Sequence, residues 1–515
     1  MKKLKSYIKG RFIDGTGKDS LCNPATEETI AEVGGGSLDV SSLLSAAHAG
    51  GAALRTLSFA ARGEILRALS KRIFAARDEL IGLAIANGGN TRGDAKFDID
   101  GASGTLAAYA ELGKSMGDRT FVVDGDSVQL TRSVRFFGRH ILVPREGVAV
   151  HINAFNFPAW NLAEKAACAL LAGVPVISKP ATATALVAGR IAELFAEESS
   201  LPQGAFSFLA GSVADLLSHL GGQDVVAFTG SAATGETVRK TAALLTHSVH
   251  VNVEADSLNA AVLGPDLDRS SEAYLLFIAD LAREMTQKTG QKCTATRRVL
   301  IPDSLAEAVR EDVSEKLAAI KVGNPALEEV TMGPLATRQQ LDDVRAGIQR
   351  LAEETRSIFG GRGEVTPIGA EKGRGFFVSP VLLEATDSAR ARVVHELEVF
   401  GPVATLLPYS GDAKVAADLV RRGQGSLVSS VYSDDREFLK QMVFALAPYH
   451  GRLFLGSSKL GGHSVGPGTV LPQLVHGGPG RAGGGEELGG ARGLHPYLQR
   501  TAISGDRPIL DALFD

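Results

Sequence analysis

Apolar side chains recur along this chain at two spacings, and the change of spacing predicts where the secondary structure changes. Over residues 59–76 they return every three or four positions, which is typical of an amphipathic helix. Residues 79–86 show the same spacing and predict a second helix. The amino-terminal part of the chain is therefore expected to be largely helical.

Between residues 147 and 253 the pattern alternates between short apolar runs and helical stretches. This alternation is typical of βαβ units and predicts a doubly wound parallel sheet. The runs expected to form strands are 148–152, 174–177, 206–209, 225–228 and 249–251. Ligands bind such sheets at the carboxyl ends of the strands. Asn156, Lys179 and Gly230 each follow one of these runs, so we expect them near a ligand.

Later segments predict a second α/β region and a closing strand. The second region covers residues 260–452, with exposed glycine loops at 360–363 and 373–375. A glycine-rich segment occupies 476–490, and residues 497–503 are expected to form a strand. The nearly uncharged run 166–178 is shorter than the roughly 20 residues of a membrane span, so we interpret it as a buried helix followed by a core strand.

Residues 119–145 predict an extended arm. Two apolar runs flank Asp124-Gly125-Asp126, which is a hairpin signal. Such an arm can pair with another subunit or form a local β-ribbon, and the sequence leaves both open.

Composition narrows the function classes. At 515 residues the chain is too long for one core, so two or three domains are expected. Hydrophobic content of 44%, charged content of 22% and a net charge of −4 give no reason to expect nucleic acid or an anionic membrane as a partner. Three cysteines far apart argue against disulfides and fit a reducing cytoplasm. The basic N-terminus is followed by no apolar stretch of signal-peptide length, so a soluble, cytoplasmic protein is expected.

Cys293, Glu254 and Asn156 are the candidate catalytic residues. A thiol can attack a carbonyl, an amide can hold the oxyanion, and a carboxylate can activate water. Lys292 precedes the thiol and could lower its pKa. A buried structural thiol is the alternative for Cys293, and an inert core thiol is the interpretation of Cys168, which lies in an apolar helix.

The motif at residues 228–231 is weaker evidence of a ligand site. Phe228-Thr229-Gly230-Ser231, with Gly235 after it, leads from a strand into a helix and could hold a pyrophosphate, although it lacks the GxGxxG fingerprint. Taken alone, the motif is better explained by an ordinary turn capped by serine.

Lys179, at a strand end, could bond ribose or phosphate, or could simply be solvated. The run 476–485 lacks the Gly-Lys-Ser/Thr ending of a phosphate loop, so a connection between domains is preferred. His247, His250 and Glu254 are not expected to bind a metal, because strand residues an odd number of positions apart face opposite sides.

Together these runs resemble the aldehyde dehydrogenase superfamily over nearly the whole chain. The matching motifs, in order, are Asn156-Phe157-Pro158, Lys179-Pro180-Ala181, Phe228-Thr229-Gly230-Ser231, Glu254, Gly290-Gln291-Lys292-Cys293, Glu398-Val399-Phe400-Gly401-Pro402 and the run 476–489. The resemblance implies that Cys293 is the nucleophile, that Asn156 and the Cys293 N–H hold the oxyanion, and that Glu254 activates water. It also implies that Glu398 and Phe400 lie at the nicotinamide side, with Lys179, Ser231 and the Gly230 turn at the adenosine and pyrophosphate side. Glu487 matches a late family glutamate near the active-site exit.

The resemblance further implies the fold and its division. We expect an α/β, aldehyde-dehydrogenase-like fold with a Rossmann-type parallel sheet domain, a second α/β catalytic domain and a small β oligomerisation arm. The expected boundaries are 1–118 and 147–254 for the cofactor domain, 255–470 for the catalytic domain, and 119–146 and 491–515 for the arm. A homodimer is expected.

One departure from the family pattern concerns the cofactor. Many NAD-using members carry glutamate three residues after the lysine, where this chain has Thr182. A carboxylate there would repel a 2′-phosphate, whereas a hydroxyl leaves room for it. We therefore expect NADP to be preferred, with NAD a weaker alternative.

A second departure concerns the substrate. Residues 254–259, Asn153-Ala154-Phe155 and the run 476–490 resemble a branch that oxidises semialdehydes carried on coenzyme A thioesters after aromatic ring cleavage. That branch serves phenylacetate degradation and benzoyl-CoA oxidation. No hydratase domain follows before Asp515, so a stand-alone dehydrogenase acting on a CoA-linked semialdehyde is expected. A CoA-acylating dehydrogenase and a non-catalytic relative are the alternatives, and the presence of Glu254 and Cys293 argues against them.

Overall fold

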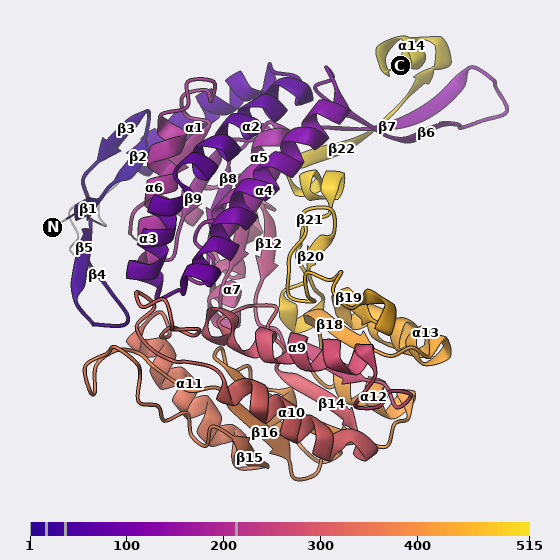
Figure 1. Ribbon diagram of the computed structural model, residues 1–515. Coiled ribbons are helices and arrows are strands. Elements are labelled where there is room, and N and C mark those ends of the chain that lie inside the picture. The colour runs from indigo at the N-terminus through magenta and orange to yellow at the C-terminus, as the bar shows by residue number, and fades with distance from the viewer. Residues whose placement is uncertain (1, 16–18, 35–38, 212–214, 515) are drawn as a thin grey trace.

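The computed structural model describes residues 2–15, 19–34, 39–211 and 215–514. It contains two α/β units and an arm that projects from the first of them, at the upper right of Figure 1. Met1 and Asp515, the outer limits of two predicted segments, lie outside the described residues.

The first unit contains a seven-stranded sheet in the order β12-β11-β8-β9-β10-β2-β3. The first five strands of that order are parallel, and the last two are antiparallel additions at the edge. The strands are β12 (His250–Glu254), β11 (Val225–Thr229), β8 (Ala149–Ile152), β9 (Val176–Lys179), β10 (Phe206–Phe208), β2 (Ser6–Ile8) and β3 (Arg11–Ile13). The five runs predicted from the sequence are therefore confirmed as the parallel strands, within three residues at their ends.

Helices and a small second sheet complete this unit. The helices are α1 (Val40–Arg55), α2 (Phe59–Ala75), α3 (Arg77–Gly88), α4 (Arg92–Met116), α5 (Trp160–Ala172), α6 (Ala185–Ala196), α7 (Ala232–Arg239) and α8 (Ala242–Thr246). The three-stranded sheet is β1 (Lys2–Leu4), β5 (Thr29–Val33) and β4 (Asp19–Cys22). Helix α5 is buried along its whole length between α4 and the sheet, which confirms the buried helix predicted from its apolar run. Cys168 lies within it among core side chains, as expected.

The second unit is built on another seven-stranded sheet, in the order β15-β16-β17-β14-β13-β18-β19. All its strands are parallel except β15 at one edge. The strands are β15 (Thr355–Phe359), β16 (Val381–Ala385), β17 (Val403–Tyr409), β14 (Arg298–Pro302), β13 (Ala260–Leu263), β18 (Ser426–Tyr432) and β19 (His450–Gly456). The helices are α9 (Glu272–Thr286), α10 (Ala306–Ala318), α11 (Arg338–Leu351), α12 (Ala413–Arg421) and α13 (Arg436–Leu446). Separate apolar clusters lie on the two faces of this sheet, so it is covered on both sides.

The arm is a three-stranded antiparallel sheet closed by the end of the chain. It consists of β6 (Val122–Gln129), β7 (Phe136–Pro144) and β22 (Leu498–Asp506), followed by α14 (Arg507–Phe514). The turn predicted at Asp124-Gly125-Asp126 is wrong. Those residues form an irregularity within β6, where the pairing with β7 shifts between Asp124 and Val128, and the connection follows at residues 130–135. Glycine in its positive-φ conformation serves a bulge as readily as a turn, which misled the interpretation.

The glycine-rich run folds back as a short hairpin of β20 (Val475–Gly477) and β21 (Glu486–Leu488). Its loop hydrogen-bonds to the end of β12, through Ala255 N–H to the Ala482 carbonyl and Gly485 N–H to the Val253 carbonyl. The segment therefore does more than connect domains, because it places side chains against the last residues of β12.

Candidate active site

The site lies where the carboxyl edge of the first sheet faces the amino edge of the second. Register aligns the strand ends of the first sheet, because Glu254 pairs with Thr229 and Ile152 pairs with Lys179. Beside them opens a cavity of about 700 Å³. The predicted site residues that line it are Asn156, Lys179, Phe228, Thr229, Gly230, Ser231, Glu254, Cys293, Glu398 and Phe400. Thr182, Gly235 and Glu487 are not among the lining residues.

The turn before Cys293 is unusually contorted. Lys288, Thr289 and Gly290 have φ values of +53°, +56° and +67°, a region that non-glycine residues seldom adopt. Thr289 donates its hydroxyl to the Gly333 carbonyl at 2.9 Å, which helps to hold this conformation. At Gly290 a side chain is excluded, because its Cβ would lie 2.2 Å from the Gly401 carbonyl oxygen.

Arg297 connects the segments that carry Cys293 and Glu398. Its guanidinium is buried and donates to the carbonyls of Gly290 at 2.8 Å and Gly401 at 2.7 Å. Asn259 adds a bond from its amide to the Cys293 carbonyl at 2.7 Å. The segment that carries Cys293 is therefore held by two buried side chains, and the residues that supply them directly precede strands β13 and β14 of the second sheet.

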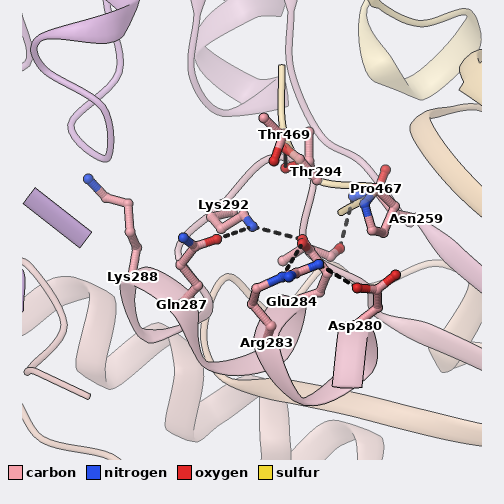
Figure 2. Close-up of polar contacts among 12 residues, drawn as sticks. Asn259, Asp280, Arg283, Glu284, Gln287, Lys288, Lys292, Thr294, Pro467 and Thr469 are labelled. Carbon is pink, nitrogen blue, oxygen red and sulfur yellow. Dashed lines mark hydrogen bonds and ion pairs between the residues drawn. The ribbon is translucent and has the colours of Figure 1, made fainter. Parts of the chain in front are cut away.

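Lys292 does not act on the thiol as the sequence suggested. Lys292 is not among the residues that line the cavity, and its ammonium lies 2.8 Å from both Glu284 Oε2 and Gln287 Oε1, a pairing that Figure 2 shows. The pKa of the Cys293 thiol is raised, by loss of hydration first and then by the charge of Glu254. The predicted lowering is therefore wrong, because the Lys292 ammonium is paired with Glu284 and Gln287.

His476 is a site residue that the sequence interpretation missed. Its Nε2 lies 3.2 Å from Glu254 Oε2 and 3.9 Å from Cys293 Sγ, and the side chain is only 3% exposed. Burial alone would raise the pKa of Glu254, but the imidazole lowers it well below its usual range. The signal in the sequence was a histidine at the start of a glycine-rich run.

A buried row of charges lies behind Glu254. Lys165 Nζ lies 3.3 Å from Glu164 Oε1 and 3.2 Å from Glu487 Oε2, and Asn252 donates to Glu487 Oε1 at 3.2 Å. Burial raises the pKa of Glu164 to about 7. Glu487, expected near an active-site exit, is thus 8% exposed and part of this row.

The residues predicted to hold the adenosine and pyrophosphate side of the cofactor lie along the carboxyl edge of the first sheet. Ser231 caps α7, accepting a bond from Thr234 N–H at 3.3 Å, and Lys179 donates to the Pro180 carbonyl at 3.0 Å. Gly230 is required sterically, because a Cβ there would lie 2.6 Å from the Phe228 ring. A Cβ added at Gly235 would lie 3.1 Å from the Val253 side chain, which is also a tight contact.

This cavity fits a nicotinamide dinucleotide. Glu398 Oε1 is buried at its wall and has no hydrogen-bond partner among the described residues, and Arg297 Nε is 4.0 Å away. Burial raises the pKa of this carboxyl. Glu398 is one of the residues that line the cavity, and a carboxylate at its wall suits the hydroxyl groups of a ribose.

One group of metal-type ligands occurs in the described ranges. The Glu254, Cys293 and His476 ligand atoms lie within 4.8 Å of one another. Among the described residues, the trio considered from the sequence (His247, His250 and Glu254) does not form such a group. The group that does form consists of two predicted catalytic residues, Glu254 and Cys293, together with His476.

The chain belongs to the aldehyde dehydrogenase family, whose model matches residues 12–503. It is 44% identical over 479 residues to the 3,4-dehydroadipyl-CoA semialdehyde dehydrogenase of Aromatoleum evansii, covering 93% of each chain. Among solved structures, betaine aldehyde dehydrogenase from Staphylococcus aureus in complex with NAD+ is similar with a TM-score of 0.85 and 23% identity, over 98% of this chain and 95% of that one. A 3,6-anhydro-L-galactose dehydrogenase in complex with NADP gives 0.85 and 22%, over 98% and 100%.

These comparisons confirm the predicted family, the predicted fold and the prediction that the protein is an oxidoreductase acting on aldehydes. Among the described residues no helix is both long and apolar enough to cross a membrane.

Proposed function

We propose that this protein oxidises a semialdehyde carried on a coenzyme A thioester to the carboxylic acid, with NADP as the preferred oxidant. The observation that carries the proposal is the placement of Cys293 and Glu254 at one cavity that Glu398 also lines. The similarity to the Aromatoleum enzyme supports a substrate of the 3,4-dehydroadipyl-CoA semialdehyde type.

In the proposed reaction, Cys293 Sγ attacks the aldehyde carbon to form a thiohemiacetal. Asn156 and the Cys293 backbone N–H stabilise the oxyanion. Asn156 Nδ2 already donates to the Gln291 carbonyl at 3.0 Å, so its amide is oriented beside the nucleophile segment. A nicotinamide held beside Glu398 and Phe400 would supply the hydride acceptor that converts the thiohemiacetal on Cys293 into a thioester. Glu254 then takes a proton from the water that hydrolyses this thioester.

The cofactor assignment depends on Thr182. It begins a short helical turn (Thr182–Thr184) between β9 and α6, three residues after Lys179. Its small hydroxyl leaves room for a 2′-phosphate, while Lys179 supplies a nearby positive charge. Burial lowers the pKa of Lys179 below its usual range. Ser231 and the turn of residues 228–230, with Gly235 packed behind it, would hold the pyrophosphate, and Glu398 and Phe400 the nicotinamide side.

A panel of substrates tests the proposal. NADPH formation is measured with free aliphatic and aromatic aldehydes and with CoA-linked semialdehydes of several chain lengths, and the product is identified by mass spectrometry. We expect the CoA-linked compounds to give the highest kcat/KM and the free acid as product. Equal or higher kcat/KM for free aldehydes would overturn the substrate assignment.

Two alternative activities remain as outcomes of the same panel. The 3-oxo-5,6-dehydrosuberyl-CoA semialdehyde of phenylacetate degradation is a close chemical variant, and a preference for it would redefine the substrate but not the class. A CoA-acylating dehydrogenase would release a new thioester in the presence of coenzyme A. Glu254 argues against this because a water-activating carboxylate faces Cys293.

We also propose that the arm joins two copies of the chain into a homodimer. Apolar side chains are exposed on β6, on its connection to β7 and on α14: Val128, Leu130, Val134, Ile509 and Leu513. Exposed apolar patches of this kind mark interaction surfaces. Light scattering on size-exclusion fractions should give twice the chain mass of 53.9 kDa. Replacing both Val134 and Ile509 by aspartate should give the monomer, and an unchanged mass would contradict the assignment.

The two sheets share no strand, which supports the division at about residue 254 between cofactor and catalytic domains.

A further inference from the structure

A second cavity opens beside the second α/β unit. Its volume is about 670 Å³, which is within the range of small-molecule sites. Its wall comes from three segments far apart in sequence: the stretch after β16, the turn after α12 and the loop of the β20–β21 hairpin. Four of its nine lining residues are arginines (Arg390, Arg392, Arg422 and Arg481), and none of the nine lines the first cavity. The positive lining points to an anion.

His395, another lining residue, has a buried N–H that nothing accepts. The guanidinium of Arg298 lies 3.0 Å from His395 Nδ1, and it also donates to the carbonyls of Leu258, Leu419 and Val420. A guanidinium has donors only, so Nδ1 accepts and the ring proton is on Nε2. The side chain is 4% exposed, and Nε2 has no partner among the residues that the structure describes. A buried donor left unpaired is rare and costly, which indicates that a ligand supplies the acceptor.

We propose that this cavity binds the phosphoryl group of a small phosphorylated ligand, which accepts hydrogen bonds from His395 Nε2 and from the guanidinium of Arg422. The site goes beyond the proposed function and does not depend on it, because it shares no lining residue with the cavity at Cys293.

Arg422 is the arginine of this lining that is most available to a ligand. Its side chain is exposed, and Nη1 donates to the Ala389 carbonyl at 2.6 Å. In the described ranges of the chain it forms no ion pair with a carboxylate. It lies close enough to His395 for its charge, together with burial and Arg298, to lower the pKa of that imidazole to about 3. The ring is therefore a neutral donor beside a cation that has no counter-ion of its own.

Two further arginines can turn toward the same ligand. Arg390 lies 3.5 Å from Asp387, and Arg392 lies 3.7 Å from Glu396. Both guanidinium groups are exposed, and exposed pairs of this kind add little stability, so an anion in the cavity competes for them at small cost.

The fourth arginine builds the wall. Arg481 pairs with Asp256 at 2.9 Å and donates to the carbonyls of His395 at 3.2 Å and Glu396 at 2.8 Å. Its own N–H donates to the Gln424 carbonyl at 3.1 Å, and Gln424 has a φ of +57°, which non-glycine residues seldom adopt. The hairpin thus joins the other two segments, and the cavity is formed before a ligand arrives.

A phosphoryl group suits this arrangement better than a carboxylate does. The donors come from separate segments and so approach from different directions. A phosphoryl group offers three strong acceptor oxygens and up to two negative charges, whereas a carboxylate offers two oxygens in one plane. Arginine also matches phosphate with two parallel hydrogen bonds.

Calorimetric titration of the full chain tests the site without aldehyde or turnover, so its outcome is separate from that of the proposed function. The probes are inorganic phosphate, adenosine 3′,5′-bisphosphate and, as a carboxylate, acetate. Arg422→Gln and His395→Asn are compared with the wild type. Asparagine keeps an acceptor for Arg298 but lacks the Nε2 donor. Arg11→Gln is the matched control, because it removes the same charge from an exposed position on β3 of the first unit. Thermal unfolding verifies that each variant is folded.

We expect the wild type to bind a phosphate probe and not acetate. Affinity should fall by about 10- to 100-fold in Arg422→Gln and in His395→Asn, and Arg11→Gln should match the wild type. Tighter binding of the bisphosphate would identify a nucleotide phosphate, of the kind that coenzyme A carries, as the ligand, whereas equal binding would identify free phosphate. The proposal is overturned if the wild type binds neither phosphate probe, or if all four proteins bind them with equal affinity.

Discussion

The ammonium of Lys292, the residue that precedes Cys293, lies 2.8 Å from the Glu284 carboxylate. The Lys292 and Glu284 side chains are 1% and 2% exposed. Gln287 accepts a second bond from the ammonium, and Arg283 extends the row of charges to Asp280 in Figure 2. The residue before Cys293 is therefore an anchor for the segment, and its charge is compensated away from the thiol.

Breaking this buried pair should destabilise the protein. Lys292→Met leaves the Glu284 carboxylate buried without its cation, which costs about 3–5 kcal/mol in comparable cases. Chemical unfolding measures the loss. Lys240→Met is the matched control, because the Lys240–Glu236 pair is exposed on α7 and its removal should leave the transition unchanged. Equal transitions for all three proteins would contradict the anchoring role.

Replacing Glu254 by Gln should separate the two halves of the reaction. The amide cannot take a proton from water, so the steady-state rate should fall by about 10²- to 10⁴-fold. One burst of reduced nicotinamide per active site should remain, because hydride transfer precedes hydrolysis. Stopped-flow absorbance measures both quantities, and loss of the burst together with turnover would assign Glu254 to the first half instead.

The Glu254–His476 pair should give stability that depends on pH. The lowered carboxyl pKa means that its contribution is present above about pH 4.3 and is lost as pH falls through the folded value. The raised imidazole pKa means that its contribution is complete below about 6.5 and is lost as pH rises through the folded value. The difference in unfolding free energy between wild type and His476→Asn should therefore be largest near pH 5.5 and smaller at pH 8.5, as urea titrations at the two values can show.

A carboxylate at position 182 should reverse the cofactor preference. Two unit charges 4 Å apart interact by about 1 kcal/mol in water and about 4 kcal/mol near a protein surface. Thr182→Glu should thus lower the ratio of kcat/KM for NADP over NAD by at least about fivefold. Thr182→Ser keeps a hydroxyl and should retain the wild-type ratio. A wild-type enzyme that already prefers NAD would refute the assignment before any substitution.

Much of the fold and of the site followed from the sequence because parallel strands end at a common edge. Asn156, Lys179 and Gly230 come just after such ends, so the local pattern placed them together. The order of the family motifs added Cys293 and Glu398 to the predicted site. Both come from the second α/β unit, and hydrophobic periodicity alone could not place them near the first sheet.

The remaining features depend on tertiary contacts that no local pattern records. His476 reaches Cys293 only because the β20–β21 hairpin folds back onto β12. The direction of Lys292 is set by Glu284, eight positions earlier on a helix. The bulge at Gly125 and a tight turn there share the same residue preferences, so only the pairing with β7 distinguishes them.

The pairing of β22 with β7 has a consequence for the order of events during synthesis. Residues 498–506 run antiparallel to residues 136–144, so the arm's central strand waits for a partner that is translated much later. At about 5–20 residues per second, β7 would be made roughly 20 to 70 s before β22. During that interval its edge is open to any other strand, and a chain that lacks β22 cannot close it. Completion of the arm thus reports that translation has passed residue 506, and assembly through this arm would admit only chains that contain β22.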